Sequence, residues 1–426
     1  MAEFDTDILI AGGGLAGATL ALAIERQVPG LRVLVAETFP LSDEPAADDY
    51  QPSYDARSTA LAWGSRLVFE QLGLWQAISR QATAIEHIHV SEQGRFGVTR
   101  LAARTRGQPA LGYVVDNRWL GQCLMAGLQQ SAGIEWLAPA TVDRVDPVST
   151  GVDVSLTAAG QTRQLRARCL VVADGGRSGL REQLGIATSR RDYHQVALIA
   201  NVSTERPHQN TAYERFTPNG PMALLPLAQG PVPGHSSALV WTLTPQALDE
   251  VLALPQEQQC ARLQQVFGWR LGRITRIGEI HHYPLALVTA DEWVRPGIAL
   301  VGNAAHSLHP VAGQGFNLAL RGLTALVEAF RFAADNGQSP GDLQVLQRYR
   351  RQHYDDQFRT IAFSDSLVRV FGSDSTALAM ARSAGLAGLD VMPAAKSWFA
   401  RQAMGLGGRK DGRSQDSSGQ ERGTWQ

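Results

Sequence analysis

The sequence predicts an α/β protein made of a parallel, doubly wound domain, an inserted antiparallel β-sheet domain and a C-terminal helical region. Three observations predict this class. Residues 7–27 form a strand, a glycine-rich turn and an alanine-rich helix, and alternating apolar segments with turn signals fill the middle of the chain. A last strand at 297–305 is followed by a glycine-rich turn and a long helix at about 315–336.

The composition argues against several classes of protein. The 426 residues are 44% hydrophobic and 19% charged, with a formal net charge of −1, so the chain lacks the basic footprint of a nucleic-acid binder and is too apolar to be disordered as a whole. The three cysteines, Cys123, Cys169 and Cys260, form no CxxC pair, which predicts neither a disulfide framework nor a zinc ribbon. No apolar run approaches the roughly 18 residues of a membrane span, and the N-terminus has no basic region typical of a secretory signal. We therefore expect a reduced, cytoplasmic globular protein that binds no nucleic acid.

The first unit is a strand, a helix and a second strand. Residues 7–11 (DILIA) are an apolar run, three glycines follow, LAGATLALAIERQ has helical character, and 32–37 (RVLVAE) is again strand-like. A βαβ unit completed in about thirty residues is typical of a Rossmann-like sheet.

Further elements follow along the chain. We expect a loop at 38–54, a helix at 57–80, a strand of a different sheet at 85–92, a helix at 117–131 and a strand pair at 152–172. Strand-like segments at 195–205, 211–228 and 236–244, with turn signals at 218–221 and 230–235, indicate an antiparallel sheet. The pattern from 340 to 404 is helical, and the tail from 405 to 426 is predicted to be disordered because almost nothing in it is apolar.

The glycine-rich turn is the first motif that carries chemistry. In this GxGxxG pattern Gly12 permits a tight turn, Gly14 lets the backbone approach a pyrophosphate, and Gly17 allows close helix–strand packing. Glu37 ends the second strand, where its carboxylate can accept the two hydroxyls of a ribose. The alternative is a glycine-rich turn without a ligand, and the motif by itself does not separate NAD from FAD.

Two further blocks follow apolar strands. Residues 173–181 (ADGGRSGLR) place Asp174 directly after a strand, a position that by itself most often marks a turn. Residues 302–317 (GNAAHSLHPVAGQGFN) combine a small polar side chain, a proline-fixed bend and glycines that open a helix. Such a turn lets the backbone approach a flat ligand, and the following helix N-terminus can stabilise negative charge on it.

Together these blocks resemble the flavoprotein aromatic hydroxylases typified by p-hydroxybenzoate hydroxylase. The resemblance rests on the order and spacing of GxGxxG, DGxxSxxR and G(D/N)AAHxxxPxxGQGxN, and it extends from residue 5 to about 400. Within that group the chain is most similar to the ubiquinone-biosynthesis branch. The segments that carry this closer likeness are 55–61 (DARSTAL), 214–227 (ERFTPNGPMALLPL), 267–275 (FGWRLGRIT) and 283–288 (YPLALV).

The resemblance implies FAD as the bound nucleotide and NADPH or NADH as the reductant. By the family pattern the ADP half is held by Gly12, Gly14, Ala16, Gly17 and Glu37. Arg57, early in its predicted helix, and Asn117 would contact the pyrophosphate and ribityl region, Asp174 would lie between FAD and the reductant, and Asn303 would bind the ribityl chain. The isoalloxazine ring would be lined by Pro310, Gly313, Gly315 and Asn317.

The chain departs from the family pattern at two positions. Asn303 stands where many relatives have Asp, and an amide can still hydrogen-bond a hydroxyl. Gly322 stands where an Asp is common in the following helix.

The expected domains are discontinuous. The FAD-binding domain comprises residues 5–83, 108–185 and 283–336, and the β-sheet substrate domain comprises 84–107 and 186–282. The C-terminal helical region covers 337–404 and precedes the tail. The helices of 340–404 either pack in the core, which we favour, or meet a membrane or partner chain.

The substrate site is less clearly marked. Several apolar residues either line a tunnel for a prenyl tail or form the core of the antiparallel sheet. They are Met222, Leu224, Leu225, Leu227 and Trp241, and Pro310 is a further candidate for lining the substrate site. His306 and His309 have a metal-ligand spacing but no third ligand nearby, so we expect no metal.

The resemblance implies an FAD-dependent monooxygenase that hydroxylates a polyprenylated methoxyphenol para to the phenol oxygen, using NAD(P)H and O₂ through a flavin hydroperoxide. The protein then binds flavin, holds the phenol and excludes water, and no catalytic triad or phenol-deprotonating base is identified. The alternatives are a sister ring hydroxylase of the pathway, a hydroxylase of a soluble aromatic, a flavin-dependent prenyl reductase and a non-catalytic flavin-binding scaffold. A hydrophobic substrate makes a biosynthetic complex or peripheral contact with the inner membrane a further expectation.

Overall fold

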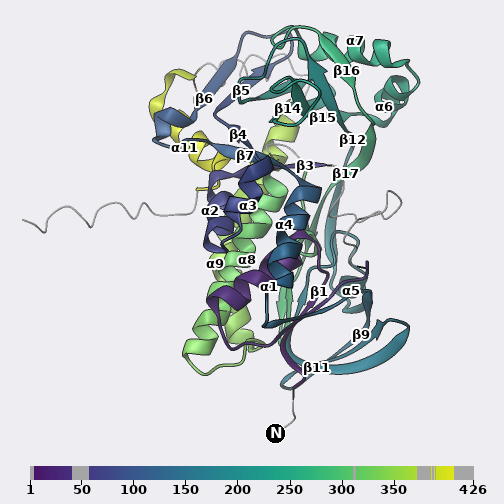
Figure 1. Cartoon of the computed structure of the whole chain (residues 1–426), viewed down its shortest axis with the longest axis vertical. Helices are drawn as coiled ribbons and strands as arrows, with labels where there is room; N and C mark the ends of the chain where they lie inside the picture. The colour runs from purple at the N-terminus through teal and green to yellow at the C-terminus, as the bar shows by residue number, and fades with distance from the viewer. Residues whose placement is uncertain are drawn as a thin grey trace, which may run out of the picture.

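The computed structural model describes residues 4–40, 57–309, 313–371, 385, 388 and 390–406 (Figure 1). Residues 407–426, most of the tail predicted to be disordered, lie outside the described residues, as does most of the predicted loop at 38–54. Two large sheets and one small sheet are connected by helices, so the α/β fold class with a C-terminal helical region is confirmed.

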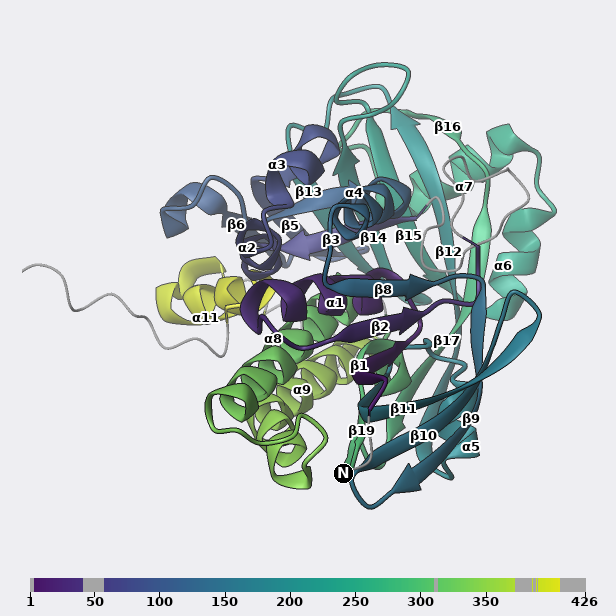
Figure 2. The same ribbon diagram turned by 60° about the horizontal axis from the view of Figure 1, so that its bottom comes forward.

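The first sheet is the parallel one that the βαβ pattern predicts. Its main order is β18-β19-β11-β1-β2-β8, and β10 and β9 extend β11 as an antiparallel ribbon. Figure 2 shows β8, β2, β1 and β11 in this order. β1 pairs in parallel with both β2 and β11, and its residues from Ile8 onward are almost fully buried because helices cover the sheet. The strands are β1 (Thr6–Ala11), β2 (Val33–Ala36), β8 (Ile134–Leu137), β9 (Ala140–Val148), β10 (Gly151–Ala158), β11 (Gln161–Val172), β18 (Val294–Arg295) and β19 (Ile298–Leu300).

Helices close the parallel sheet. α1 contacts both α4 and α8, and α8 packs along α9 (Figures 1 and 2). α4 begins after Asp116, whose side chain accepts hydrogen bonds from the backbone N–H groups of Arg118 and Trp119. These helices are α1 (Leu15–Gln27), α4 (Asn117–Gln129), α5 (Gly179–Gln183), α8 (Gln314–Asp335) and α9 (Leu343–Phe371).

The second sheet has the order β20-β17-β12-β15-β14-β13-β5-β6, and β16 pairs with β12. It is antiparallel as predicted except between β13 and β5, which run parallel. α6 (Pro245–Leu252) and α7 (Gln256–Phe267) pack on its outer face, at the upper right of Figure 1. The strands are β5 (His87–Glu92), β6 (Val98–Ala102), β12 (Thr188–Thr204), β13 (Thr211–Thr217), β14 (Gly220–Leu227), β15 (Ser236–Leu243), β16 (Ile274–Ile277), β17 (His281–Ala290) and β20 (His306–Ser307).

The long helix predicted at 57–80 is wrong. Residues 58–62 form a strand that pairs with a segment about fifty residues later, and a helix begins only at Trp63. This long-range pairing overrides the helical pattern of the segment, and Arg57 consequently precedes a strand. The elements are β3 (Ser58–Ala62), α2 (Trp63–Gln71), α3 (Trp75–Ile78), the 3₁₀ turns η1 (Ser79–Gln81) and η2 (Ala103–Arg106), β4 (Thr83–Ile85) and β7 (Gly112–Asp116).

The other predicted boundaries mostly hold. The strand predicted at 297–305 ends at Leu300 and continues as a 3₁₀ turn, η3 (Gly302–Ala304). β8 and β9 carry no motif and were not predicted.

The C-terminal helices bury one face each. α9 packs on α8, and α11 (Pro393–Ala403) packs against α2, where the N–H of Gly64 donates to the carbonyl oxygen of Met404 at 2.9 Å. Ala400 and Met404 join Trp63 in one apolar cluster. Among the described residues, no helix is long and apolar enough to cross a membrane.

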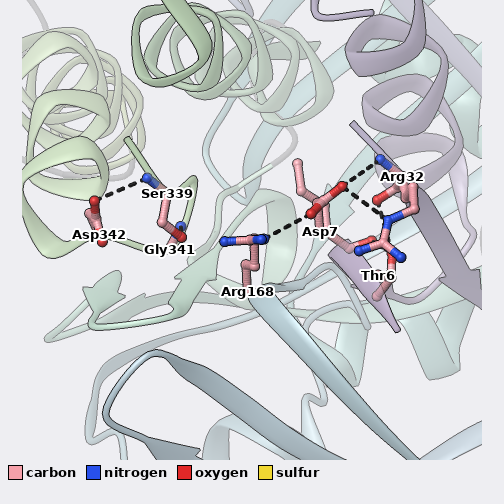
Figure 3. Close-up of polar contacts among 8 residues, drawn as sticks. Thr6, Asp7, Arg32, Arg168, Ser339, Gly341 and Asp342 are labelled. Carbon is pink, nitrogen blue, oxygen red and sulfur yellow. Dashed lines mark hydrogen bonds and ion pairs between the residues drawn. The ribbon is translucent and has the colours of Figure 1, made fainter. Parts of the chain in front are cut away.

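Asp7 ties the amino ends of β1 and β2 to the interior of β11 (Figure 3). Its carboxylate accepts from the backbone N–H of Arg32 at 2.9 Å and from Nε of Arg168, on β11, at 2.9 Å. Burial raises the pKa of Asp7, but the hydrogen bonds from Arg32 and Arg168 outweigh it and hold the pKa below its usual value. On the other side of Arg168 the turn at 339–342 packs so closely that a side chain at Gly341 would overlap the Arg168 carbonyl oxygen.

We predict that Asp7→Asn lowers the free energy of unfolding by about 1 kcal/mol at pH 7, because one partner of a part-buried charged cluster is lost. A carboxylate with a lowered pKa stabilises the fold above its unfolded pKa, so the gap to wild type should close as the pH falls below about 4. Urea unfolding at pH 7 and pH 3 measures this. Asp146→Asn, which alters an exposed ion pair with Arg144, is the control and should leave the midpoint unchanged. A gap of the same size at pH 3 and pH 7 would contradict the assignment.

Candidate active site

The carboxyl ends of four parallel strands meet at one edge of the first sheet. Gly12, Glu37, Ala173 and Val301 directly follow β1, β2, β11 and β19. Backbone hydrogen bonds join these ends: the N–H of Gly12 donates to Ala36, that of Ala173 donates to Ala11, and that of Val301 donates to Val172. The three sequence blocks are therefore neighbours, at the place where open α/β sheets bind ligands.

The glycine-rich turn lies in a space that excludes side chains. Gly12 has a φ of +101°, and a Cβ there would lie 2.6 Å from the carbonyl oxygen of Ala173. A Cβ at Gly17 would overlap the carbonyl oxygen of Gly12, so α1 starts as close to β1 as the backbone allows. Gly14 precedes α1, and no side chain caps that helix. The first N–H groups of α1 thus lack a side-chain acceptor, which suits a phosphate.

Glu37 is held beside this turn. Its carboxylate accepts hydrogen bonds from the N–H of Gly13 at 2.5 Å and from the N–H of Phe39 at 3.0 Å. These bonds fix the carboxylate at the end of β2, next to the glycines. This is the position predicted for a group that binds a ribose.

The DGxxSxxR block forms a polar clasp. Ser178 donates to one Asp174 oxygen at 2.8 Å, and Nη1 of Arg181 donates to the carbonyl oxygen of Ala304 at 2.9 Å. The other Asp174 oxygen is buried without a hydrogen-bond partner among the described residues. Burial raises the pKa of Asp174, and the Ser178 hydrogen bond opposes this. The clasp links the turns after β11 and β19, a role of Ser178 and Arg181 that the sequence analysis missed.

Asn317 is a clamp between α8 and β3. Its Oδ1 accepts from the N–H of Ala62 and the hydroxyl of Ser65, and its Nδ2 donates to the carbonyl oxygens of Ala60 and Gly313, all at 2.7–2.8 Å. The side chain is therefore fully used within the protein. Asn317 would therefore act on a bound ring through the turn that it holds, because its amide atoms are already hydrogen-bonded within the protein.

The remaining predicted residues gather around the same edge. The Oδ1 of Asn117 accepts from the Thr59 hydroxyl at 2.5 Å, and the Arg57 guanidinium lies over the Tyr283 ring, 4.7 Å from its centroid. Asn303 is exposed on η3. Pro310 lies outside the described residues. Gly313, with a φ of +59°, starts α8, and a Cβ at Gly315 would meet nothing within 4 Å.

A cavity of about 710 Å³ joins this edge to the inner face of the second sheet. A volume of this order is typical of small-molecule sites. Its first wall comes from the three sequence blocks and their neighbours, and includes Gly14, Ala16, Asn117, Asn303, Gly313 and Gly315. Its second wall includes one row of cross-strand neighbours, namely Val90, Glu214, Ala223, Val240, Ile199 and His281. Phe363, Phe399 and Ala403 of the C-terminal helices also line it.

Comparison with known proteins identifies the family. The model of the FAD binding domain family matches residues 5–354. Ubiquinone hydroxylase UbiL of Rhodospirillum rubrum is 37% identical over 399 residues, covering 94% of this chain and 89% of that protein. This chain belongs to the FAD-dependent monooxygenases.

Two further likenesses agree with this assignment. The 3-demethoxyubiquinol 3-hydroxylase of Escherichia coli is 29% identical to this monooxygenase over 407 residues, covering 95% of this chain and all of that protein. The crystal structure of p-nitrophenol 4-monooxygenase PnpA from Pseudomonas putida has a TM-score of 0.74 at 17% identity, with 96% of this chain and all of that chain covered. At that identity the second likeness concerns the fold alone.

The residues present fit FAD. The uncapped start of α1 would hold the pyrophosphate, Glu37 the ribose, and Asn303 and the turn before α8 the ribityl chain and ring. When bound, FAD takes two electrons from NAD(P)H and activates O₂. The protein's own contribution is to fix the turns: Arg181 and Asn317 hold them with side chains so that glycine backbone would face the cofactor.

The predicted substrate-lining residues divide between two faces of the sheet. Leu225 lines the cavity. Met222, Leu224 and Trp241 do not: they are at most 2% exposed and pack in the core under α6 and α7, so the core alternative holds for them. Successive strand residues point to opposite faces, and Met222 and Trp241 are cross-strand neighbours on the outer one. Leu227 packs beside Ile85, in a small cluster next to the cavity.

The histidines of the third block are buried. His306 lies 6.1 Å, centroid to centroid, from His353 of α9, and burial lowers the pKa of His306 to about 3 and that of His353 to about 4. A Cβ at Gly322 would lie 2.9 Å from Nε2 of His353, so His353 fills the space at this departure from the family pattern. Within the described ranges, no group of three His, Cys, Asp or Glu residues is placed to hold a metal ion.

We predict that Gly14→Val abolishes FAD retention, because a branched side chain would stand where the backbone approaches the pyrophosphate. The flavin-to-protein absorbance ratio of the purified variant should fall to near zero. Far-UV circular dichroism should remain that of the wild type, since the change touches neither sheet. Full FAD occupancy in the variant would show that the phosphate lies elsewhere.

Proposed function

We propose that this monooxygenase is a 2-polyprenyl-6-methoxyphenol hydroxylase of ubiquinone biosynthesis, which adds oxygen para to the phenol oxygen. The observation that carries the proposal is a cavity with two different walls. One wall consists of the turns that would hold FAD, and the other is largely apolar sheet surface. Relatives that cover nearly the whole chain carry names of ubiquinone hydroxylases, which supports the same pathway.

The overall reaction sets what the protein must do. The phenol, O₂, NAD(P)H and a proton give the hydroxylated phenol, water and NAD(P)⁺. One oxygen atom enters the ring and the other leaves as water. Water that reaches the site diverts the reaction to hydrogen peroxide, so the protein must hold the ring close to the flavin in a dry space.

The cavity has apolar walls that suit such a space. Small apolar side chains such as Ala223 and Val240 leave room for a ring, and Leu225 and Ile88 extend the apolar surface for a prenyl tail. Phe363 and Phe399 of the C-terminal helices cover the cavity on another side. A phenol directs electrophilic oxygen to its ortho and para carbons, so orientation by these walls decides the product.

A sister hydroxylation at another ring position is the second candidate, because the Escherichia coli relative is named for a 3-hydroxylation. The proposal also includes a peripheral contact with the inner membrane or with a partner enzyme, since a prenyl tail partitions into lipid.

The first test is a lipid extract of a strain lacking this gene, analysed by mass spectrometry. The expected result is accumulation of 2-polyprenyl-6-methoxyphenol, reversed when the gene is restored. Another accumulated precursor would move the enzyme to a sister step. Unaltered quinone pools would overturn the pathway assignment and leave a soluble aromatic as the substrate.

An assay of the purified enzyme separates the remaining classes. With ¹⁸O₂ and 2-prenyl-6-methoxyphenol as the probe, one labelled atom should enter the ring. A prenyl reductase would incorporate none, and a scaffold would not oxidise NAD(P)H in response to the probe.

We further predict that substitutions of two neighbouring leucines affect different properties: one mainly the stability, the other mainly KM. Leu224→Ala should lower the free energy of unfolding by about 2–5 kcal/mol, because Leu224 is fully buried under α6 and α7, with KM for the probe unchanged. Leu225→Ala should destabilise less and raise KM, because Leu225 lines the cavity. Urea unfolding and steady-state kinetics on both variants measure this. Equal effects of the two variants on KM would contradict the assignment of faces.

A further inference from the structure

Glu214 is an acidic side chain in an apolar part of the cavity wall. It lies on β13, where its neighbours in the cross-strand row are Val90 of β5 and Ala223 of β14. All three residues line the cavity, and Glu214 is only part-exposed. Within the described ranges its carboxyl group makes no hydrogen bond or ion pair. An acidic group in such surroundings destabilises a fold, so its presence calls for a role at the site.

We propose that Glu214 accepts the proton of the substrate phenol during hydroxylation. This inference rests on the proposed function, since it requires a phenol in the cavity. It supplies the base that the sequence analysis did not identify.

The proton balance of the step is complete. The phenol O–H bond breaks, an O–H bond forms on the Glu214 carboxylate, and the electron pair stays on the phenol oxygen. The negative charge raises electron density at the para carbon, which forms the new C–O bond with one oxygen atom of the O₂ that bound FAD would activate. The O–O bond breaks in this step, and its electron pair stays on the second oxygen atom. That carbon then loses its hydrogen as a proton, which ends in the water made from the second oxygen atom. Glu214 returns its own proton to the original oxygen as the ring becomes aromatic again.

The surroundings of Glu214 suit this transfer. Burial raises its pKa to about 7. A phenol has an ordinary pKa of about 10, so transfer to Glu214 is unfavourable by about 10³, instead of by about 10⁵ or more for an ordinary carboxylate. A base poised near neutral pH is also the one best matched to general-base catalysis there.

Other titratable or charged groups in the cavity wall are less suited. Glu279 is 84% exposed and lies 3.9 Å from His281, which is itself 42% exposed, so both are in contact with solvent. Burial lowers the pKa of His309 to about 4, which makes it a weak base. The remaining two are the cation Arg57 and the phenol Tyr283, which lie against each other. Burial alone accounts for the raised pKa of Glu214.

The test compares Glu214→Gln with wild-type holoenzyme, using 2-prenyl-6-methoxyphenol as the probe. We expect KM to stay within about threefold, and product formed per unit time at pH 8 to fall about 10²-fold, with hydrogen peroxide formed instead. In wild type the product yield per NAD(P)H should rise with pH through about 7, and in the variant this rise should be absent. Glu214→Asp, which keeps a carboxylate, should retain the rise at a lower rate.

A substrate change separates a base from a structural role. A probe with fluorine on the ring carbon beside the methoxy group has a more acidic phenol and needs the base less. The ratio of wild-type to Glu214→Gln product rates should therefore shrink with this probe. A ratio that does not change would overturn the inference, because a packing role is insensitive to the acidity of the phenol.

Stability provides a readout that needs no substrate. A carboxyl whose folded pKa is raised destabilises the fold increasingly as the pH rises from its unfolded pKa to its folded pKa. Glu214→Gln should therefore gain stability over wild type between about pH 4.5 and pH 7 and keep that gain at higher pH. Glu250→Gln, an exposed change on α6 across the same sheet, is the matched control and should show no such gain and a wild-type pH profile.

The outcomes separate this inference from the proposed function. If wild type makes no hydroxylated product from the probe, the proposed function fails. If wild type makes product and Glu214→Gln matches its rate and pH profile, the assignment of Glu214 as the base is wrong while the proposed function stands.

Discussion

The parallel pairing of β1 with both β2 and β11 is the constraint on which the site depends. Parallel strands end at the same edge, so this pairing brings Glu37 and the Asp174 turn beside the glycines that follow β1. The pairing tolerates no side chain at Gly12 or Gly17, because neighbouring backbone already occupies that space. Backbone N–H groups at the start of α1 are left without a side-chain cap, an arrangement that suits a phosphate.

Several side chains at this edge of the first sheet form hydrogen bonds that fix the neighbouring turns. Asn317 uses both atoms of its amide to bind β3 and the turn before α8, and Arg181 binds η3. Such residues determine where the glycine-rich turns lie, while the turns themselves would present backbone to a flat cofactor. Motif residues of one block therefore have different physical tasks, and spacing alone does not distinguish them.

The two faces of the second sheet have different roles: one packs in a core that stabilises the fold, and the other lines the cavity. Its outer face packs against α6 and α7 and forms a closed core around Trp241 and Leu224. Its inner face remains open as the cavity wall and carries Glu214, a group that no core would retain unpaired. A single strand such as β14 contributes to both tasks through alternate residues.

The sequence by itself determined the parts of this protein that depend on local pattern. The βαβ unit, the three blocks and the strand-like middle segments follow from periodicity and turn chemistry over a few residues, and the family follows from their order. Tertiary structure decided the rest. Residues 58–62 form a strand because β7 pairs with them, against their helical pattern. Adjacent Leu224 and Leu225 must face opposite sides, but only the packing of α6 and α7 decides which side is core. Glu214 is marked by its burial, and burial arises only when distant strands assemble around it.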